Sequence, residues 1–151
     1  MPGNVLGRTA RPADRPLIAV VDDDASFLRS VGRLLRAAGY DVQMFGTARD
    51  FLAHLPACKP QCLVLDVHMP GMSGLELQER LAADGSCLPI IFVTAYDTPQ
   101  TRESARRAGG FGLLLKPFDQ QALLQTIAFA LSGQPPDTAP SQDPRQDRPN
   151  T

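Results

Sequence analysis

Cysteine, tryptophan and long apolar runs are scarce or absent in this sequence. It has three cysteines and no tryptophan. Cys58, Cys62 and Cys87 are odd in number and form no Cys-x-x-Cys pair, so neither a disulfide framework nor a zinc site is indicated. No apolar run approaches the ~20 residues that a membrane-spanning helix needs. We therefore expect a protein of the reducing cytoplasm without a membrane segment.

An excess of charge of either sign is also lacking. The 15 Lys and Arg residues oppose 16 Asp and Glu residues, which gives a formal net charge of -1. No basic surplus favours direct binding of nucleic acid, and no acidic surplus typical of a disordered chain is present. The 151 residues, 43% of them hydrophobic, suffice for one domain with its own core.

Proline-rich, weakly apolar segments flank the predicted domain. Residues 1–16 show no apolar periodicity, and residues 132–151 contain five prolines and no Val, Ile, Leu or Phe. Neither segment can bury enough apolar surface to offset the entropy of ordering. We expect a disordered leader over 1–16, a folded domain over 17–131, and a disordered Pro-rich tail or linker over 132–151.

Short apolar runs alternate with helical patterns inside this domain. The runs favour buried strands, and the periodic segments between them begin at Ser, Thr or Asp caps that favour helices. Single helices between strands favour parallel pairing, because each crossover returns the chain to the same edge. The sequence predicts an α/β fold, a doubly wound parallel sheet with five strands near residues 17–21, 41–45, 62–65, 89–93 and 112–115.

Two of the predicted helices have unusual features. The helix that follows Thr47 contains Pro56, at which we expect it to stop. The helix from Thr98 to Ala108 offers only Ala105 and Ala108 as apolar contacts. We therefore expect this helix to pack weakly and to move readily.

Four of the predicted strands are followed directly by polar side chains: Asp22-Asp23-Asp24, Asp66, Thr94 and Lys116. Parallel strands share one carboxyl edge, so these side chains converge if the strands are neighbours, as in the flavodoxin-like order 2-1-3-4-5. Adjacent strands lie ~4.8 Å apart, and carboxylates that close repel one another unless a cation joins them. Oxygen ligands that include Asp23 and Asp66 suit Mg²⁺ with retained waters.

Lys116 and Thr94 extend this pattern beyond a metal site. An ammonium, a hydroxyl and a metal ion together neutralise the oxygens of a phosphoryl group in transfer. Asp66 is then the nucleophile and forms an aspartyl phosphate. Each residue has a structural explanation of its own, as a helix cap or an exposed charge. For those explanations to hold, the polar residues at all four strand ends would have to lack a function at once, so we favour the functional interpretation.

These motifs strongly resemble the receiver domain of two-component response regulators, with a CheY-like fold and most like the FixJ kind. The resemblance covers roughly residues 17–131 and rests on Asp22-Asp23, Asp66-x-x-Met69-Pro70-x-Met72-x-Gly74, Thr94-Ala95 and Lys116-Pro117-Phe118. It implies the flavodoxin-like (βα)5 sheet with strand order 2-1-3-4-5.

The resemblance also implies the site chemistry. Asp66 accepts phosphate from a histidine kinase, a phosphotransfer protein or a small phosphodonor. Asp23 and Asp66 bind Mg²⁺ directly together with the backbone carbonyl of His68, and Asp22 acts through water. The domain is then a switch that assists its own phosphorylation and dephosphorylation, and not an enzyme.

Signalling follows from the same resemblance. Thr94 and Lys116 contact the phosphoryl oxygens, and the Lys116-Pro117 peptide is expected to be cis. Phosphorylation shifts the fourth helix, the fifth strand and the last helix, and this face switches partner binding or forms a homodimer. We expect the kinase to dock on the first helix near Phe27 and Leu28.

Two positions are unusual for that family. Leu113 lies three residues before Lys116, where the family usually carries Tyr or Phe, and Phe111 is too early in the chain to replace that ring. We expect Leu113 to lack a two-position switch and movement of Thr94 to pass through the backbone alone. Tyr96 is bulky where attacking water would approach, and we expect it to shield the acyl phosphate.

Two other functions stay open on the sequence alone. One is a haloacid-dehalogenase-like phosphohydrolase, because Asp22-x-Asp24 follows the first strand, although no acidic pair follows Lys116 and Asp66 is left unexplained. The other is a receiver-shaped binding module that is never phosphorylated, which Leu113 leaves possible.

Overall fold

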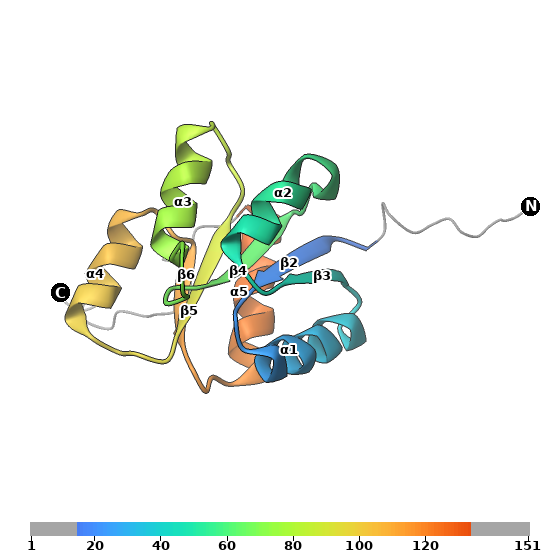
Figure 1. Cartoon of the computed structure of the whole chain (residues 1–151). Helices are drawn as coiled ribbons and strands as arrows, with labels where there is room; N and C mark the ends of the chain where they lie inside the picture. Colours follow the sequence, from blue (N-terminus) through green and yellow to red (C-terminus); the bar gives the residue numbers. More distant parts are fainter. Residues whose placement is uncertain (1–14, 134–151) are drawn as a thin grey trace, which may run out of the picture.

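A computed structural model describes residues 15–133 of the chain, which are built on one parallel sheet (Figure 1). Its strands are β2 (Leu17–Val21), β3 (Asp41–Phe45), β4 (Cys62–Asp66), β5 (Ile90–Thr94) and β6 (Gly112–Leu115). They pair in parallel in the order β3-β2-β4-β5-β6. Counted along the chain, this is the order 2-1-3-4-5, so the predicted flavodoxin-like fold class is confirmed.

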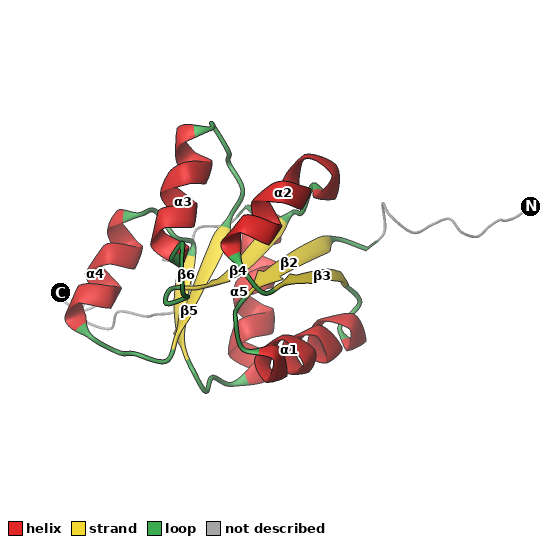
Figure 2. Ribbon diagram, viewed as in Figure 1, coloured by secondary structure: helices red, strands yellow, loops and turns green. Residues whose placement is uncertain are grey.

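Helices cover both faces of the sheet (Figure 2). They are α1 (Ala25–Ala37), α2 (Ala48–Cys58), α3 (Gly74–Ala83), α4 (Pro99–Arg107) and α5 (Gln120–Ser132). Alternate strand residues point to opposite faces, which divides the core in two. One core joins the strands to α1 and α5, for example through Val20, Val64, Val31 and Ile127. The other joins them to α2, α3 and α4, for example through Leu65, Phe51, Leu77 and Ala105.

Polar side chains cap the amino end of each of these helices, as the sequence predicts. The capping residues are Asp24, Thr47, Ser73, Thr98 and Asp119. At α3, the Ser73 hydroxyl accepts the Glu76 N–H and the Glu76 carboxylate accepts the Ser73 N–H. Each such cap stabilises its helix by about 1 kcal/mol. The caps fix where each helix begins relative to the carboxyl edge of the sheet.

The prediction that α2 stops at Pro56 is wrong, because the helix continues to Cys58. A proline this near a helix end removes only one helical N–H bond. The extra turn residues beyond Pro56 carry Cys58 into the core, where its side chain is buried. The helix ends where Lys59 takes a left-handed conformation with φ 49°, and its N–H donates to the Leu55 carbonyl at 3.4 Å.

The fifth strand is less buried than predicted. All four residues of β6 are half-buried, because β6 is an edge strand with a neighbour on one side. The fourth strand is displaced by one residue from its predicted range, so Thr94 is the last residue of β5. The Lys116-Pro117 peptide is cis, as the family resemblance implies.

Helix α4 has the sparse core contact that its sequence predicts. Thr101 and Ala105 are its buried residues. On the outer face, Arg106 and Arg107 both pair with Glu103 at 2.6 and 3.2 Å. Exposed ion pairs of this kind contribute little stability. That α4 moves readily stays a prediction.

The predicted leader and tail lie almost wholly outside the described residues, which run from 15 to 133. The domain limits at 17 and 131 therefore stay a prediction. Within the described part of the chain, no helix is long and apolar enough to cross a membrane.

The turn after β4 brings the start of α3 against the end of the strand. Gly74 is the first residue of α3, and its N–H donates to the Val67 carbonyl at 2.9 Å. A Cβ at position 74 would overlap the backbone carbonyl of Asp66, whose carbon atom would be only 2.9 Å away. Only glycine therefore allows this close approach.

Gly74→Ala should lower the free energy of unfolding by about 2 kcal/mol, because the overlapping atoms belong to the backbone and cannot rotate aside. Urea denaturation followed by circular dichroism measures the change. Gly46→Ala is the matched control, since a Cβ there has no neighbour within 4 Å. Equal losses in the two variants would contradict the proposed overlap.

Candidate phosphoryl and metal site

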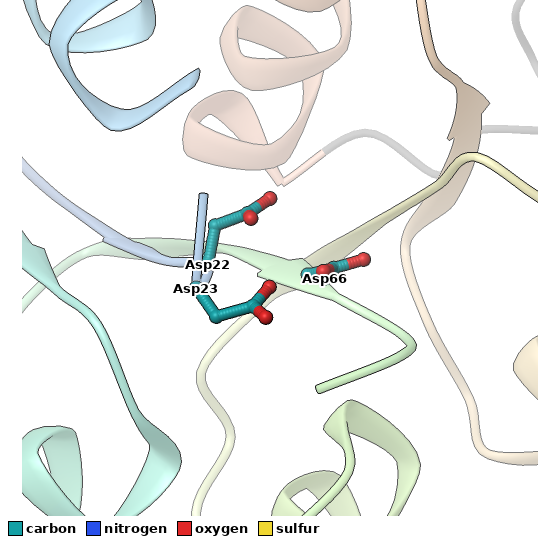
Figure 3. Close-up of side chains that lie close together, drawn as sticks. All are labelled: Asp22, Asp23 and Asp66. Carbon is teal, nitrogen blue, oxygen red and sulfur yellow. The ribbon is translucent and has the colours of Figure 1, made fainter. Parts of the chain in front are cut away.

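Three carboxylates meet at the carboxyl edge of the sheet (Figure 3). Asp22 and Asp23 follow β2, Asp66 ends β4, and one oxygen of each lies within 4.8 Å of the other two. The register explains the meeting, because Val21 lies opposite Leu65 on the neighbouring strand. The structure thus brings together the three acids that the sequence singles out.

Asp22 and Lys116 form a buried ion pair. Asp22 is fully buried, and its Oδ2 accepts a hydrogen bond from the Lys116 ammonium at 2.6 Å. Its other oxygen, Oδ1, accepts the N–H of Asp24 at 2.9 Å. The Lys116 nitrogen also lies 3.9 Å from Oδ2 of Asp66. Lys116, from the loop after β6, therefore reaches the same acids as predicted, but it is closest to Asp22.

The negative charge of Asp66 is less well neutralised by Lys116 than that of Asp22, the other buried acid of the site. Only 6% of the residue is exposed, and its Oδ1 accepts the His68 N–H at a long 3.4 Å. Burial, and secondly repulsion from Asp22, raise the pKa of Asp66 to about 6, while Lys116 acts in the opposite direction. The ionised form of Asp66 therefore costs free energy in the folded protein, and a cation bound beside it would lower that cost.

The donor set fits a hard divalent cation. It consists of carboxylate oxygens, the ligands that Mg²⁺ prefers, and Asp23 is exposed at the rim where waters could complete the shell. Asp22 already uses both oxygens on Asp24 and Lys116. Asp23 and Asp66 are therefore the better candidates for direct ligands.

The hydroxyl of Thr94 is engaged within its own loop. Thr94 is fully buried at the end of β5, next to β4. Its Oγ1 accepts the Tyr96 N–H at 3.0 Å and donates to the Tyr96 carbonyl at 3.4 Å. In this structure the hydrogen bonds of Thr94 stabilise the turn after β5. That its hydroxyl contacts a phosphoryl oxygen beside Asp66 stays a prediction.

Two aromatic contacts at the site are not evident from the sequence. The ring of Tyr96, 59% exposed, meets the ring of His68 edge to face with centroids 4.9 Å apart. On the other side, the Lys116 nitrogen lies 4.2 Å from the centroid of the Phe27 ring. Apart from the bulk of Tyr96, no sequence signal marks these pairs, because each joins segments that are distant in the chain.

Leu113 faces the opposite side of the sheet from Phe111. Leu113 packs against the core under α2, α3 and α4, whereas Phe111 packs against the core under α1 and α5. Phe111 therefore does not take the place of a ring at position 113, as predicted. Leu113 lines a pocket of about 530 Å³ beside α4, together with Arg102 and Arg106.

Comparison with known proteins decides the family. The model of the response regulator receiver domain matches residues 18–128, which is most of the chain. This protein belongs to the response regulator receiver family. The match begins at the second residue of β2 and includes the other four strands and the site described above.

Individual relatives agree with this assignment. The receiver is 43% identical over 115 residues to the transcriptional regulatory protein TdiR of Thauera aromatica, covering 76% of this chain and 51% of that protein. It is 38% identical over 114 residues to the transcriptional regulatory protein FixJ of Bradyrhizobium diazoefficiens, covering 76% and 56%. Among solved structures, the response regulator StyR matches with a TM-score of 0.70 and 44% identity, covering 80% and 61%. The chain spans about half the length of the curated relatives it matches.

The raised pKa of Asp66 predicts how stability depends on pH. Folding disfavours the carboxylate form, so stability falls as pH rises from the ordinary value of 3.8 through about 6. In EDTA at about pH 7.5, Asp66→Asn should therefore raise the free energy of unfolding by about 1–3 kcal/mol. At about pH 4 the gain should nearly vanish, because Asp66 is then protonated in the folded protein and partly protonated in the unfolded chain.

Urea denaturation of both proteins at the two pH values measures the difference. A gain that is the same at both pH values would show that it does not arise from the charge of Asp66.

Proposed function

We propose that Asp66 accepts a phosphoryl group from a phosphohistidine on a histidine kinase or phosphotransfer protein. The observation that carries the proposal is the buried carboxylate at the end of β4, which lies beside two further acids and 3.9 Å from the Lys116 ammonium. Members of the receiver family work with such donors, and they are signalling domains and not classical enzymes.

In the proposed reaction, a carboxylate oxygen of Asp66 attacks the phosphorus atom of the donor. A phosphorus–oxygen bond forms, the phosphorus–nitrogen bond breaks, and the donor imidazole keeps the electron pair and takes up a proton. Hydrolysis later reverses the modification when water attacks phosphorus, releasing inorganic phosphate and the free carboxylate. Lys116 stabilises the negative charge that gathers on the phosphoryl oxygens.

We include Mg²⁺ as the cofactor of this reaction. When bound, it supplies positive charge to the phosphoryl oxygens. Asp23 and Asp66 would hold it, with the backbone carbonyl of His68. Asp22 would act through water, a role supported by the hydrogen bonds that already occupy both of its oxygens.

The proposed switch begins at Thr94. Its hydroxyl leaves the bonds to the Tyr96 backbone and binds a phosphoryl oxygen, which pulls the loop after β5 inward. Helix α4 follows directly, and the sparse burial of α4 supports a shift of the α4, β6 and α5 face. Leu113, whose register partner on β5 is Phe92, would transmit the movement through the backbone without a rotating ring.

The proposed kinase surface lies on α1. Phe27 and Leu28 are half-buried near its start, and a groove of about 590 Å³ runs from Phe27 and Leu34 to Pro117 and Phe118. Lys116 is one of the residues that line the groove, so a partner seated in it would lie beside the acidic site. Its apolar lining supports docking of an amphipathic helix.

The output of the receiver is also a proposal. The relatives TdiR and FixJ are named as transcriptional regulators, and each is about twice as long as the matched region. We propose that the α4, β6 and α5 face regulates a partner or a homodimer, with no direct nucleic-acid contact by this domain. The three free cysteines support the cytoplasmic location.

A phosphorylation-independent binding module is the second candidate, favoured by Leu113 at the position where the family usually carries an aromatic ring. The dehalogenase-like alternative is set aside, because the chain belongs to the receiver family.

Intact mass spectrometry after incubation with phosphoramidate and Mg²⁺ tests the main proposal. The protein should gain one phosphoryl group, Asp66→Asn should gain none, and removal of Mg²⁺ with EDTA should suppress the gain. Glu76→Gln, on the neighbouring α3 cap, is the control that should still be modified. A folded wild-type protein that gains no mass would favour the binding module.

Tyr96→Ala should speed loss of the phosphoryl group by about threefold to tenfold, or roughly 1 kcal/mol of barrier, because water gains access to the acyl phosphate. Release of inorganic phosphate after the donor is removed measures the rate. Tyr96→Phe keeps the ring against His68 and should behave like the wild type. An unchanged rate in Tyr96→Ala would contradict the shielding role.

A further inference from the structure

The Lys116 ammonium is bounded by an aromatic ring as well as by acids. Its nitrogen lies 2.6 Å from Asp22 Oδ2, 3.9 Å from Asp66 Oδ2 and 4.2 Å from the centroid of Phe27. A cation over the face of an aromatic ring is attracted by the ring quadrupole, most strongly where water is displaced. Only 19% of the Lys116 side chain is exposed, so this attraction acts in a largely desolvated place.

The backbone that carries the Phe27 ring is linked to the acidic site by hydrogen bonds. Asp22 Oδ1 accepts the Asp24 N–H at 2.9 Å. Asp24 Oδ1 in turn accepts the Phe27 N–H at 3.3 Å as part of the α1 cap. The contacts form a closed circuit, because Phe27 faces Lys116 and Lys116 returns to the other oxygen of Asp22. Asp22, which binds the ammonium, is thus linked through Asp24 to the backbone of the residue whose ring faces that ammonium.

A second aromatic ring, that of Phe118, contacts the Phe27 ring. The rings of Phe27 and Phe118 meet edge to face at 89° with centroids 5.9 Å apart. Phe118 follows Lys116 by two residues, so this ring contact joins α1 to the loop that carries the ammonium. Without the ring, the flexible lysine stem could turn its charge into the groove between α1 and that loop.

From this circuit we infer that Phe27 is a positioning residue, which holds the Lys116 ammonium at the acidic site through a cation–π contact so that it reaches the phosphoryl group on Asp66. The inference rests on the proposed function and adds a residue to it. Phe27 touches none of the reacting atoms and acts through Lys116.

The variants Phe27→Leu and Phe27→Tyr distinguish the cation–π effect of the ring from simple apolar packing. The first keeps an apolar side chain without a quadrupole, and the second keeps the ring face. With phosphoramidate as the donor, Phe27→Leu should be phosphorylated about threefold to tenfold more slowly, whereas Phe27→Tyr should stay within about twofold of the wild type. A small donor is used because it does not depend on a docking surface on α1.

Two controls identify the cause of a slower rate. Phe118→Leu removes a ring that touches Phe27, and it should slow the reaction less than Phe27→Leu. In the unphosphorylated protein, the ε-methylene protons of Lys116 should lie upfield through the ring current of Phe27, as measured by NMR. That shift should be lost in Phe27→Leu and kept in Phe27→Tyr, whatever small changes in folding stability accompany the variants.

The outcomes distinguish this inference from the proposed function. Equal rates for the wild type and Phe27→Leu, or a Lys116 shift that is unchanged in Phe27→Leu, would overturn the inference and leave phosphorylation of Asp66 intact. Equal slowing in Phe27→Leu and Phe27→Tyr would also overturn it, since the ring face would then be irrelevant. A wild-type protein that is never phosphorylated would remove the proposed function and this inference with it.

Discussion

Three carboxylates meet at the carboxyl edge of the sheet, and in the described part of the chain the Lys116 ammonium pairs with two of them. This imbalance of charge governs the site. The ammonium of Lys116 pairs most closely with Asp22, at 2.6 Å, and lies 3.9 Å from Asp66. Burial and the Asp22 charge therefore act on Asp66 with incomplete compensation, and its pKa rises. A divalent cation bound here relieves repulsion between the carboxylates. It therefore stabilises this site more than it would stabilise three separate surface acids.

The surrounding backbone maintains the imbalance by keeping the acids in place. Parallel pairing of β2 and β4 sets residue 22 beside residue 66. The close approach of Gly74 and the Ser73–Glu76 capping box hold the turn after Asp66. These contacts keep the backbone at Asp22 and Asp66 together, so the two buried acids stay neighbours despite their repulsion.

Much of this arrangement could be predicted from the sequence, because it depends on local rules. Strand runs, helix caps and the shared carboxyl edge of parallel strands together place Asp22, Asp23 and Asp66 at one site. The end of α2 was harder to predict, since burial of Cys58 outweighs the single bond lost at Pro56.

The finer features of the site depend on side-chain rotamers and on contacts between distant segments, which periodicity does not encode. The hydroxyl of Thr94 bonds to its own loop. The rings of Phe27 and Tyr96 meet Lys116 and His68, which lie far from them in the chain. Sequence patterns therefore identify which groups gather at the edge of the sheet, but not how each one is held there.

The division of the helices between the two faces of the sheet separates the two hollows on the surface of the domain. The groove beside Phe27 belongs to the face covered by α1 and α5, whereas the pocket beside Leu113 lies under α4 on the other face. No residue lines both hollows, so a small ligand in the groove would not displace a ligand from the pocket.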